Sequence, residues 1–289
     1  MYVDAPNQTA YTASGLRYAY RRCGTSGSEP PLLLLSHLRG TLDSWDPALI
    51  NALATERDVI AFDHAGVGLS SGTTPRTIRD TAVDALAFMA AVGVREVDVL
   101  GFSMGGYTAQ ELALRRPAAV RRMILAATAP RGGPGIHGWS DNILARSEAD
   151  DPRLEDYLYT FFNHTESSQR SGLEFLGRYI EREHDRDLPA SREAREAQYE
   201  AMVEWGTPDH EALNRLRAIK QPTLVALGDQ DLVTPPSASY LLASLLPDVK
   251  VRTYPDSGHG FMFQHYEAFA REALAFLSEN SQNRSTPVN

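Results

Sequence analysis

A serine between two glycines is the strongest chemical signal in this sequence. Residues 101–105 read Gly-Phe-Ser-Met-Gly, after a β-type run at 97–100 and before a helical pattern that begins at Met104. A sharp turn between a strand and a helix exposes a serine hydroxyl above the edge of a sheet, and a Cβ on either flanking residue would crowd that crossing. Three fixed residues arise by chance about once in ten chains of this length. The strand–helix setting therefore supports the prediction that Ser103 is a nucleophile.

A serine hydroxyl is a poor nucleophile at neutral pH and needs a base. His259 is the best placed of the eight histidines, because the turn at 256–260 directly follows the last predicted strand. Active sites of open α/β sheets lie at the carboxyl ends of the strands. The base in turn needs an acid that holds its tautomer, and both Asp229 and Asp231 follow a strand in the segment Gly-Asp-Gln-Asp. The local pattern leaves these two carboxylates open.

The elements that must position these side chains alternate between short β-rich segments and helical patterns. This alternation is typical of an α/β protein, in which helices cover a mostly parallel sheet. The predicted strands span 16–22, 32–35, 58–62, 96–102, 120–127, 223–227 and 249–254, the first of them antiparallel. Apolar residues at helical spacing and the stop signal of Pro117 predict helices over 77–92, 104–116 and 268–279.

The alternation stops at residues 131–214, which open with two glycines, Pro134 and Gly135 and then become helical and rich in aromatic residues. This segment holds nine arginines against eighteen acidic residues, whereas the rest of the chain carries equal numbers of both signs. The whole net charge of −9 therefore lies in the segment. We expect a core domain of residues 1–130 and 215–289 and a helical cap, or lid, at 131–214.

The chain order Ser103, Asp231, His259 resembles that of the α/β-hydrolase superfamily, over about residues 10–280. The segment 228–235, Gly-Asp-Gln-Asp-Leu-Val-Thr-Pro, is similar to the acid segment of that family, whose fourth residue is the catalytic acid. The resemblance therefore favours Asp231 as the acid. It implies a capped serine hydrolase of the esterase, lactonase or haloperoxidase-like kind, with an eight-stranded, mostly parallel sheet flanked by helices and a helical lid. These motifs are specific for the fold and the triad but not for the substrate.

Two segments depart from the pattern of the family. Members usually carry His-Gly-x-x-Gly after the third strand, where this chain has Ser-His-Leu-Arg-Gly at 36–40. The resemblance then implies that the N–H groups of Leu38 and Met104 form the oxyanion hole, and that His37 either contacts the substrate or has a structural role. The segment 63–70 resembles the family's Asp-x-Arg-Gly-x-Gly-x-Ser turn, with alanine in place of arginine. Its glycines lack the spacing of a dinucleotide site, so we interpret it as a structural turn.

Nine aromatic residues between 131 and 214 indicate a substrate pocket that is mostly apolar. We expect an uncharged, moderately hydrophobic carboxylic ester or lactone as the substrate. The alternative is that most of these aromatic side chains pack the cap onto the core. The predicted substrate-binding residues are His37, Trp139, Phe161, Phe162, Trp205 and Phe261. If some of the acidic residues border the entrance, anionic substrates are disfavoured.

Other functions are compatible with the same motifs. Similar folds with an intact triad also perform cofactor-free perhydrolysis, carbon–carbon bond cleavage and cyanohydrin lysis, and these alternatives stay open. A non-catalytic receptor for a small ligand is an alternative of another class, which the three occupied triad positions disfavour. A serine at the elbow argues against dehalogenase and epoxide hydrolase chemistry, because the enzymes of those types that it resembles use a carboxylate there.

Composition argues against several further classes. The net charge of −9 disfavours a nucleic-acid partner, and a single cysteine, Cys23, excludes an intramolecular disulfide and a cysteine-based metal cluster. The phosphate-loop and HExxH metalloprotease patterns are absent, and we expect no cofactor and no metal. The first residues do not resemble a signal peptide, and no apolar run has the length of a membrane helix. We expect a cytoplasmic protein with a small-molecule substrate and no membrane partner, and the sequence leaves a homodimer open.

Overall fold

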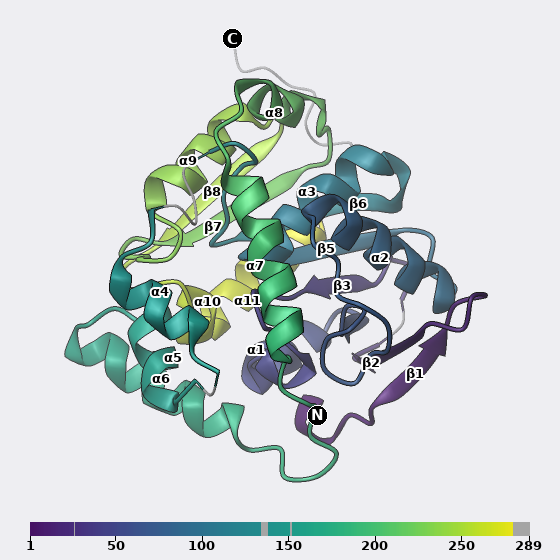
Figure 1. Cartoon of the computed structure of the whole chain (residues 1–289), viewed down its shortest axis with the longest axis horizontal. Coiled ribbons are helices and arrows are strands. Elements are labelled where there is room, and N and C mark those ends of the chain that lie inside the picture. Colours follow the sequence, from purple (N-terminus) through teal and green to yellow (C-terminus); the bar gives the residue numbers. More distant parts are fainter. Residues whose placement is uncertain (26, 134–137, 151, 280–289) are drawn as a thin grey trace.

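An eight-stranded sheet is the centre of the structure, a computed structural model that describes residues 1–25, 27–133, 138–150 and 152–279. The strand order is β1-β2-β4-β3-β5-β6-β7-β8 (Figure 1). The strands are β1 (Gln8–Tyr11), β2 (Arg17–Cys23), β3 (Leu32–Leu35), β4 (Val59–Phe62), β5 (Val97–Phe102), β6 (Val120–Ala126), β7 (Thr223–Gly228) and β8 (Val249–Tyr254). β2 pairs antiparallel with β1 and with β4, and the other neighbouring pairs are parallel. The predicted fold class, including the antiparallel early strand, is confirmed.

Seven of these strands lie within one residue of their predicted bounds. The eighth strand, β1, was not predicted. It is four residues long, and Ala10 is its one buried residue, so its sequence lacks the apolar alternation that indicates a strand. Its place in the sheet depends on pairing with β2 rather than on a local pattern.

Helices cover both faces of the sheet, and β3 illustrates the consequence. All four of its leucines are buried. Leu32 and Leu34 belong to one core cluster and Leu33 and Leu35 to another, as expected for a strand of a parallel sheet that is covered on both sides. The first cluster includes side chains of α1 (Pro47–Ala54), α10 (Phe261–Gln264) and α11 (Tyr266–Leu277), and the second those of α2 (Ile78–Ala91), α3 (Met104–Arg115) and α9 (Pro236–Leu245).

The three predicted helices are present as α2, α3 and α11, with ends shifted by one or two residues. Thr77 caps α2, because its side chain accepts a hydrogen bond from the N–H of Asp80. The helices α1 and α9, both of which start with a proline, were not predicted. Short 3₁₀ helices lie in the described part of the core at Tyr2–Asp4, Leu42–Ser44, Pro117–Ala119 and Leu216–Ala218. In the described part of the chain, no helix has both the length and the apolar character to cross a bilayer.

The chain between β6 and β7 is helical, and we refer to residues 131–214 as the cap segment. Its described helices are α4 (Asp141–Glu148), α5 (Leu154–Phe161), α6 (Glu166–Tyr179), α7 (Arg192–Gly206) and α8 (His210–Arg215), the last ending one residue beyond the predicted boundary. Pro134 and Gly135, with which the segment was expected to open, lie outside the described residues. Figure 1 shows α4, α5 and α6 grouped together and α7 crossing in front of the sheet. Phe175 of α6 stacks on Phe263 of α10, with ring centroids 4.7 Å apart.

A pair of carboxyl groups also joins the cap segment to the core. Asp63, directly after β4, and Asp187, between α6 and α7, both accept a hydrogen bond from the N–H of Leu42, at 3.1 and 2.8 Å. Burial and the neighbouring charge of Asp187 hold the pKa of Asp63 well above its usual range. The protonated form of Asp63 is therefore favoured where its carboxyl group meets that of Asp187, at the boundary between cap and core.

Candidate active site

Ser103 lies at a strained turn between β5 and α3. Its backbone has φ 55° and ψ −118°, and a residue in such a sparsely populated region costs about 1–3 kcal/mol unless its surroundings enforce the conformation. The Ser103 N–H donates to the carbonyl of Ala126 at 2.9 Å. The Ser103 carbonyl accepts from the N–H of Gly106 and from the hydroxyl of Thr128, each at 2.8 Å. Hydrogen bonds with α3, with the end of β6 and with the residues that follow β6 thus hold the turn.

The glycines on either side of Ser103 are required by close packing, as predicted. A Cβ on Gly101 would press on the backbone of Gly105, and a Cβ on Gly105 would overlap the carbonyl oxygen of Leu35. Backbone atoms cannot rotate away as the end of a side chain can. Only glycine therefore lets α3 start this close to β3 and β5, which places the N–H of Met104 beside the segment that follows β3.

His259 and Asp231 form a buried hydrogen-bonded pair in the turns that follow β8 and β7. The Nδ1–H of His259 donates to Oδ2 of Asp231 at 2.8 Å. Oδ1 of Asp231 accepts from the N–H groups of Val233 and Thr234, at 2.8 and 2.9 Å. His259 is 2% exposed and Asp231 is 4% exposed. Because the carboxylate fixes the proton on Nδ1, Nε2 carries the lone pair that a general base requires.

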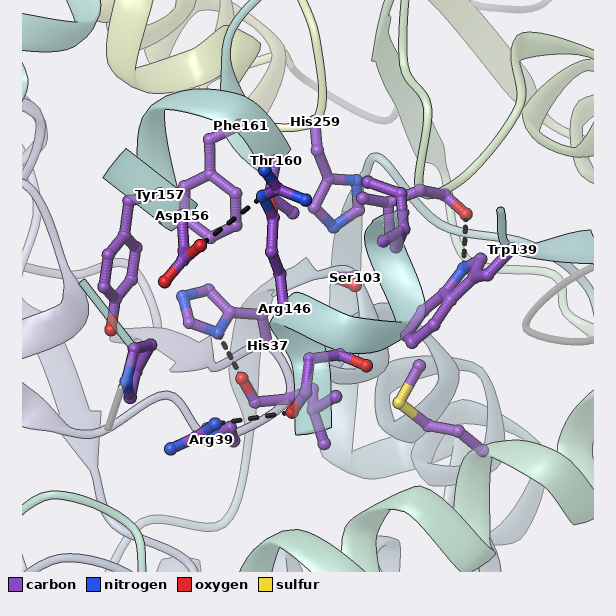
Figure 2. A pocket seen from close by; sticks show the side chains of 16 residues that line it. His37, Arg39, Ser103, Trp139, Arg146, Asp156, Tyr157, Thr160, Phe161 and His259 are labelled. Atoms are coloured by element: carbon purple, nitrogen blue, oxygen red, sulfur yellow. Dashed lines mark hydrogen bonds and ion pairs between the residues drawn. The ribbon is translucent and has the colours of Figure 1, made fainter. Parts of the chain in front are cut away.

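Ser103 and His259 line the same pocket, which offers about 690 Å³ of space, part of it open to solvent. Figure 2 shows both side chains facing this pocket. Among the described residues no hydrogen bond joins the Ser103 hydroxyl to the imidazole. Such bonds are often long before a substrate binds. The structure thus brings the three predicted side chains, including Asp231 behind His259, to one site.

The rest of the pocket wall is mostly apolar, and its charged groups have partners. It consists of His37, Leu38, Arg39, Trp139, Ile143, Arg146, Ser147, Pro152, Asp156, Tyr157, Thr160, Phe161, Met202 and Val233. Nε of Arg146 lies 3.4 Å from Oδ1 of Asp156, and the guanidinium stacks on Tyr159 at 3.8 Å from the ring centroid. Within the described ranges, no group of three or more histidine, cysteine, aspartate or glutamate side chains could hold a metal ion.

The segment 36–40, which we call the oxyanion loop, forms a tight turn beside Ser103. The N–H of Gly40 donates to the carbonyl of His37 at 2.9 Å, and Arg39 has φ 65°, as in a type II turn. No hydrogen bond among the described residues uses the N–H of Leu38 or of Met104. Neither predicted oxyanion donor therefore has a partner within the described residues; Leu38 lines the pocket, whereas Met104 is absent from its described wall.

His37 packs between aromatic rings at the base of this loop. Its Nδ1–H donates to the carbonyl of Leu38 at 2.8 Å. The imidazole centroid lies 5.1 Å from that of Phe102 and 5.3 Å from that of Phe161. Burial lowers the pKa of His37 to about 4, so the ring is neutral at neutral pH. These contacts support a structural role, while its place in the pocket wall keeps substrate contact open.

Three of the six predicted substrate-binding residues line the pocket. They are His37, Trp139 and Phe161. Trp139 is anchored beside the acid turn, because its indole N–H donates to the carbonyl of Val233 at 2.8 Å (Figure 2). The cap segment therefore contributes walls to a pocket whose floor belongs to the core.

The structure corrects the predicted placement of the other three residues, which are absent from the described pocket wall. Phe162 packs on Phe175, with ring centroids 5.6 Å apart, and Trp205 stacks on Tyr107 at 5.3 Å. Phe261 is fully buried in the core cluster around α11. An aromatic residue type shows that a side chain is apolar but not which way it faces, so these residues pack the cap and the core instead.

Sequence reasoning missed the polar part of the pocket wall. Arg146 comes from α4 and Asp156 from α5, and the spacing of two residues on different helices does not reveal that they meet. Arg39 carried a local signal, because it follows Leu38 in the predicted oxyanion loop. Its partners, however, lie more than one hundred residues away along the chain.

Comparisons with known proteins agree with this architecture. The model of the alpha/beta hydrolase fold family matches residues 30–266. The chain is 30% identical over 271 residues to the "Putative carbamate hydrolase RutD" of Azorhizobium caulinodans, covering 89% of this chain and 94% of that protein. It is 29% identical over 244 residues to the 2-hydroxymuconate semialdehyde hydrolase of Pseudomonas putida, covering 77% and 78% of the two chains.

A solved structure is similar over nearly the whole length. An alpha/beta hydrolase fold protein from Chitinophaga pinensis superposes with a TM-score of 0.89 at 39% sequence identity, covering 96% of this chain and 99% of that chain. The sheet order, the strained serine turn and the family match lead to the same assignment. This chain belongs to the alpha/beta hydrolase family.

Proposed function

We propose that this protein is a serine hydrolase that cleaves an uncharged, moderately hydrophobic carboxylic ester or lactone through an acyl-enzyme. The observation that carries the proposal is the 2.8 Å bond from His259 Nδ1 to Asp231, in a pocket that Ser103 also lines. The strained backbone of Ser103 adds support, because such strain persists at functional sites.

The proposed mechanism assigns each group one role. Nε2 of His259 takes the hydroxyl proton of Ser103 as Oγ attacks the carbonyl carbon, and the resulting oxyanion accepts hydrogen bonds from the N–H groups of Leu38 and Met104. His259 then returns the proton to the leaving alcohol. Water enters and gives a proton to the same imidazole as its oxygen attacks the acyl carbon, and the imidazolium then protonates Oγ of Ser103 as the acid product leaves. Asp231 stabilises the imidazolium in both halves of the reaction.

An uncharged substrate is supported by the partners of the charged groups in the pocket wall. Arg146 is occupied by Asp156 and Tyr159, and the guanidinium of Arg39 donates to backbone carbonyls of the cap segment. Apolar side chains form much of the remaining wall. We further propose that the cap segment acts as a lid over this pocket and that its substrate is a small molecule.

Carbamate hydrolysis is the second candidate, because the relative at 30% identity is named as a carbamate hydrolase. A carbamate presents the same acyl carbon to Ser103, with nitrogen in place of carbon on one side of it. A panel that contains neutral esters, lactones and carbamates of equal size separates the two candidates. Peroxide added to the ester reactions tests for perhydrolysis.

The decisive experiment compares wild type with Ser103→Ala on that panel. We expect the substitution to lower kcat by about 10⁴-fold or more without changing the melting temperature, and a fluorophosphonate probe to label wild type only. Ser244→Ala, an exposed serine on α9, is the control and should behave as wild type. Turnover retained by the Ser103→Ala variant would defeat the nucleophile assignment. Failure of wild type to react with the probe would favour a non-catalytic receptor.

A further inference from the structure

The oxyanion loop contains an arginine where its backbone favours glycine. Arg39 has φ 65°, and the left-handed region costs a residue with a Cβ about 1–2 kcal/mol. The side chain is long and half-buried. Such a residue keeps a strained backbone only where the surrounding contacts enforce it, and the hydrogen bonds of Arg39 among the described residues all join it to the cap segment.

The guanidinium of Arg39 caps the carboxyl end of α4. Nη1 donates to the carbonyl of Ala149 at 2.6 Å and to that of Ser147 at 3.3 Å, and Nη2 donates to that of Asp150 at 3.3 Å. The last carbonyls of a helix lack partners within the helix, and a cation there is also favoured by the helix dipole. The position of the Arg39 side chain is therefore tied to the position of α4.

The backbone of Arg39 is tied to a second cap helix. Its N–H donates to Oε1 of Gln198 on α7 at 2.8 Å, and Gln198 is 3% exposed. The carbonyl in the same peptide unit belongs to Leu38, and it accepts from Nδ1 of His37 at 2.8 Å. Both polar groups of the 38–39 peptide are thus held, one of them by the cap segment.

That peptide adjoins the N–H of Leu38, which the proposed mechanism assigns to the oxyanion hole. The N–H of Leu38 belongs to the preceding planar peptide, which shares the Cα of Leu38 with the 38–39 peptide. A displacement of the 38–39 peptide that moves this Cα therefore also moves the Leu38 N–H. A cap that is docked through α4 and α7 therefore holds this donor in one direction. If the cap segment moves away, the hydrogen bonds of Arg39 with the end of α4 and with Gln198 of α7 break together.

We propose that Arg39 is a positioning residue through which the docked cap segment holds the Leu38 N–H at the oxyanion site. This inference rests on the proposed function. It predicts that transition-state stabilisation, rather than substrate binding, depends on the contacts of Arg39 with Ala149 and Gln198. The hydrolytic step would then be favoured only while the cap is docked.

The test measures kcat and KM for a neutral ester and for its thionoester, whose sulfur accepts hydrogen bonds weakly and so depends less on the oxyanion hole. Arg39→Asn removes the reach of the guanidinium and tolerates the left-handed backbone. We expect this variant to lower kcat for the ester by about 10- to 100-fold, a part of the ~10²–10³ that a lost oxyanion donor costs. KM should stay within about threefold, and the preference for ester over thionoester should fall. Arg39→Lys should recover part of kcat.

The matched control is Arg195→Ala. Arg195 on α7 also caps the end of α4, through the carbonyl of Glu148 at 2.6 Å, but no hydrogen bond or ion pair among the described residues joins it to the oxyanion loop. A general loosening of α4 would lower kcat in both variants. The positioning role instead predicts that kcat of Arg195→Ala stays within about threefold of wild type. Gln198→Leu should lower kcat in the same way as Arg39→Asn, and the double variant should lose less than the product of the two single losses.

Three results separate the outcomes. An unchanged ester-to-thionoester preference in Arg39→Asn, or an equal loss in Arg195→Ala, overturns the positioning role while the proposed function stands. Absence of Ser103-dependent ester hydrolysis in wild type overturns the proposed function and this inference together. If Arg39→Asn does not fold, as shown by its circular dichroism, Gln198→Leu and Arg39→Lys decide the question with the same readouts.

Discussion

Replacing Asp231 by asparagine tests the arrangement of the site with a side chain of the same size and shape, because only one carboxylate oxygen is exchanged for an amide nitrogen. Oδ1 of Asp231 accepts from the N–H groups of Val233 and Thr234. These two donors favour an oxygen at that position, so the amide nitrogen of the substituted side chain faces His259. The imidazole must then accept a hydrogen bond on Nδ1 and carry its proton on Nε2. The nitrogen that faces the pocket becomes a donor, which cannot take the proton of Ser103.

The expected loss follows from this change of tautomer. An equivalent substitution in a serine protease triad lowers kcat by about 10⁴-fold with the geometry intact. A loss of 10³- to 10⁴-fold corresponds to about 4–5.5 kcal/mol of transition-state stabilisation. Stability should change much less, because the amide is isosteric and keeps the two backbone hydrogen bonds.

The assay is steady-state hydrolysis of a neutral ester, with thermal unfolding measured in parallel. Asp229→Asn is the matched control, because Asp229 was the other candidate acid. Its Oδ1 accepts from the backbone N–H of Ser257 at 3.3 Å, a turn contact that an asparagine oxygen also provides. We expect kcat of this variant within about threefold of wild type. Activity of Asp231→Asn within tenfold of wild type, or an equal loss in Asp229→Asn, would refute the assignment of the acid.

Two further predictions concern stability. The pKa of Asp63 is higher in the folded chain than in the unfolded chain. Above about pH 4 the unfolded state therefore binds fewer protons than the folded state. The free energy of unfolding should then fall as the pH rises toward the pKa of Asp63 in the folded chain. Asp187→Asn removes the neighbouring charge that raises the pKa of Asp63 and offers it an amide hydrogen, so urea titrations of this variant should show a smaller fall. Gly105→Ala should lower the free energy of unfolding by about 2 kcal/mol or more, because its Cβ would overlap the backbone of Leu35.

Each stability prediction has a result that contradicts it. A fall with pH that is equally steep in wild type and in Asp187→Asn would show that Asp187 does not raise the pKa of Asp63. For the glycine, the control is Gly177→Ala on α6, where a Cβ would meet nothing within 4 Å. That substitution should raise stability by up to about 1 kcal/mol. Equal effects of the two alanines would show that the serine turn is not packed as described.

Local patterns in the sequence were sufficient for most of the core. The leucines of β3 indicate burial on both faces, and the glycines around Ser103 indicate a close crossing, because both features depend on neighbours within a few residues. His259 could be placed near Asp229 and Asp231 in advance because the carboxyl ends of parallel strands meet at one edge of the sheet, and the family resemblance favoured Asp231 of the two. Their 2.8 Å contact agrees with that expectation.

The pocket wall depended on the tertiary structure. The sequence predicted that Phe162 and Trp205 would contact the substrate, yet both pack away from the described pocket wall, because residue type does not encode the direction in which a helix presents it. The contact of Arg39 with Ala149 joins residues 110 positions apart. Hydrophobic periodicity and turn chemistry are local properties, whereas the wall of this pocket arises where a cap helix docks on a core loop. No local pattern specifies that docking, and for this reason the sequence predicted that Ser103, Asp231 and His259 would meet but predicted only part of the pocket wall around them.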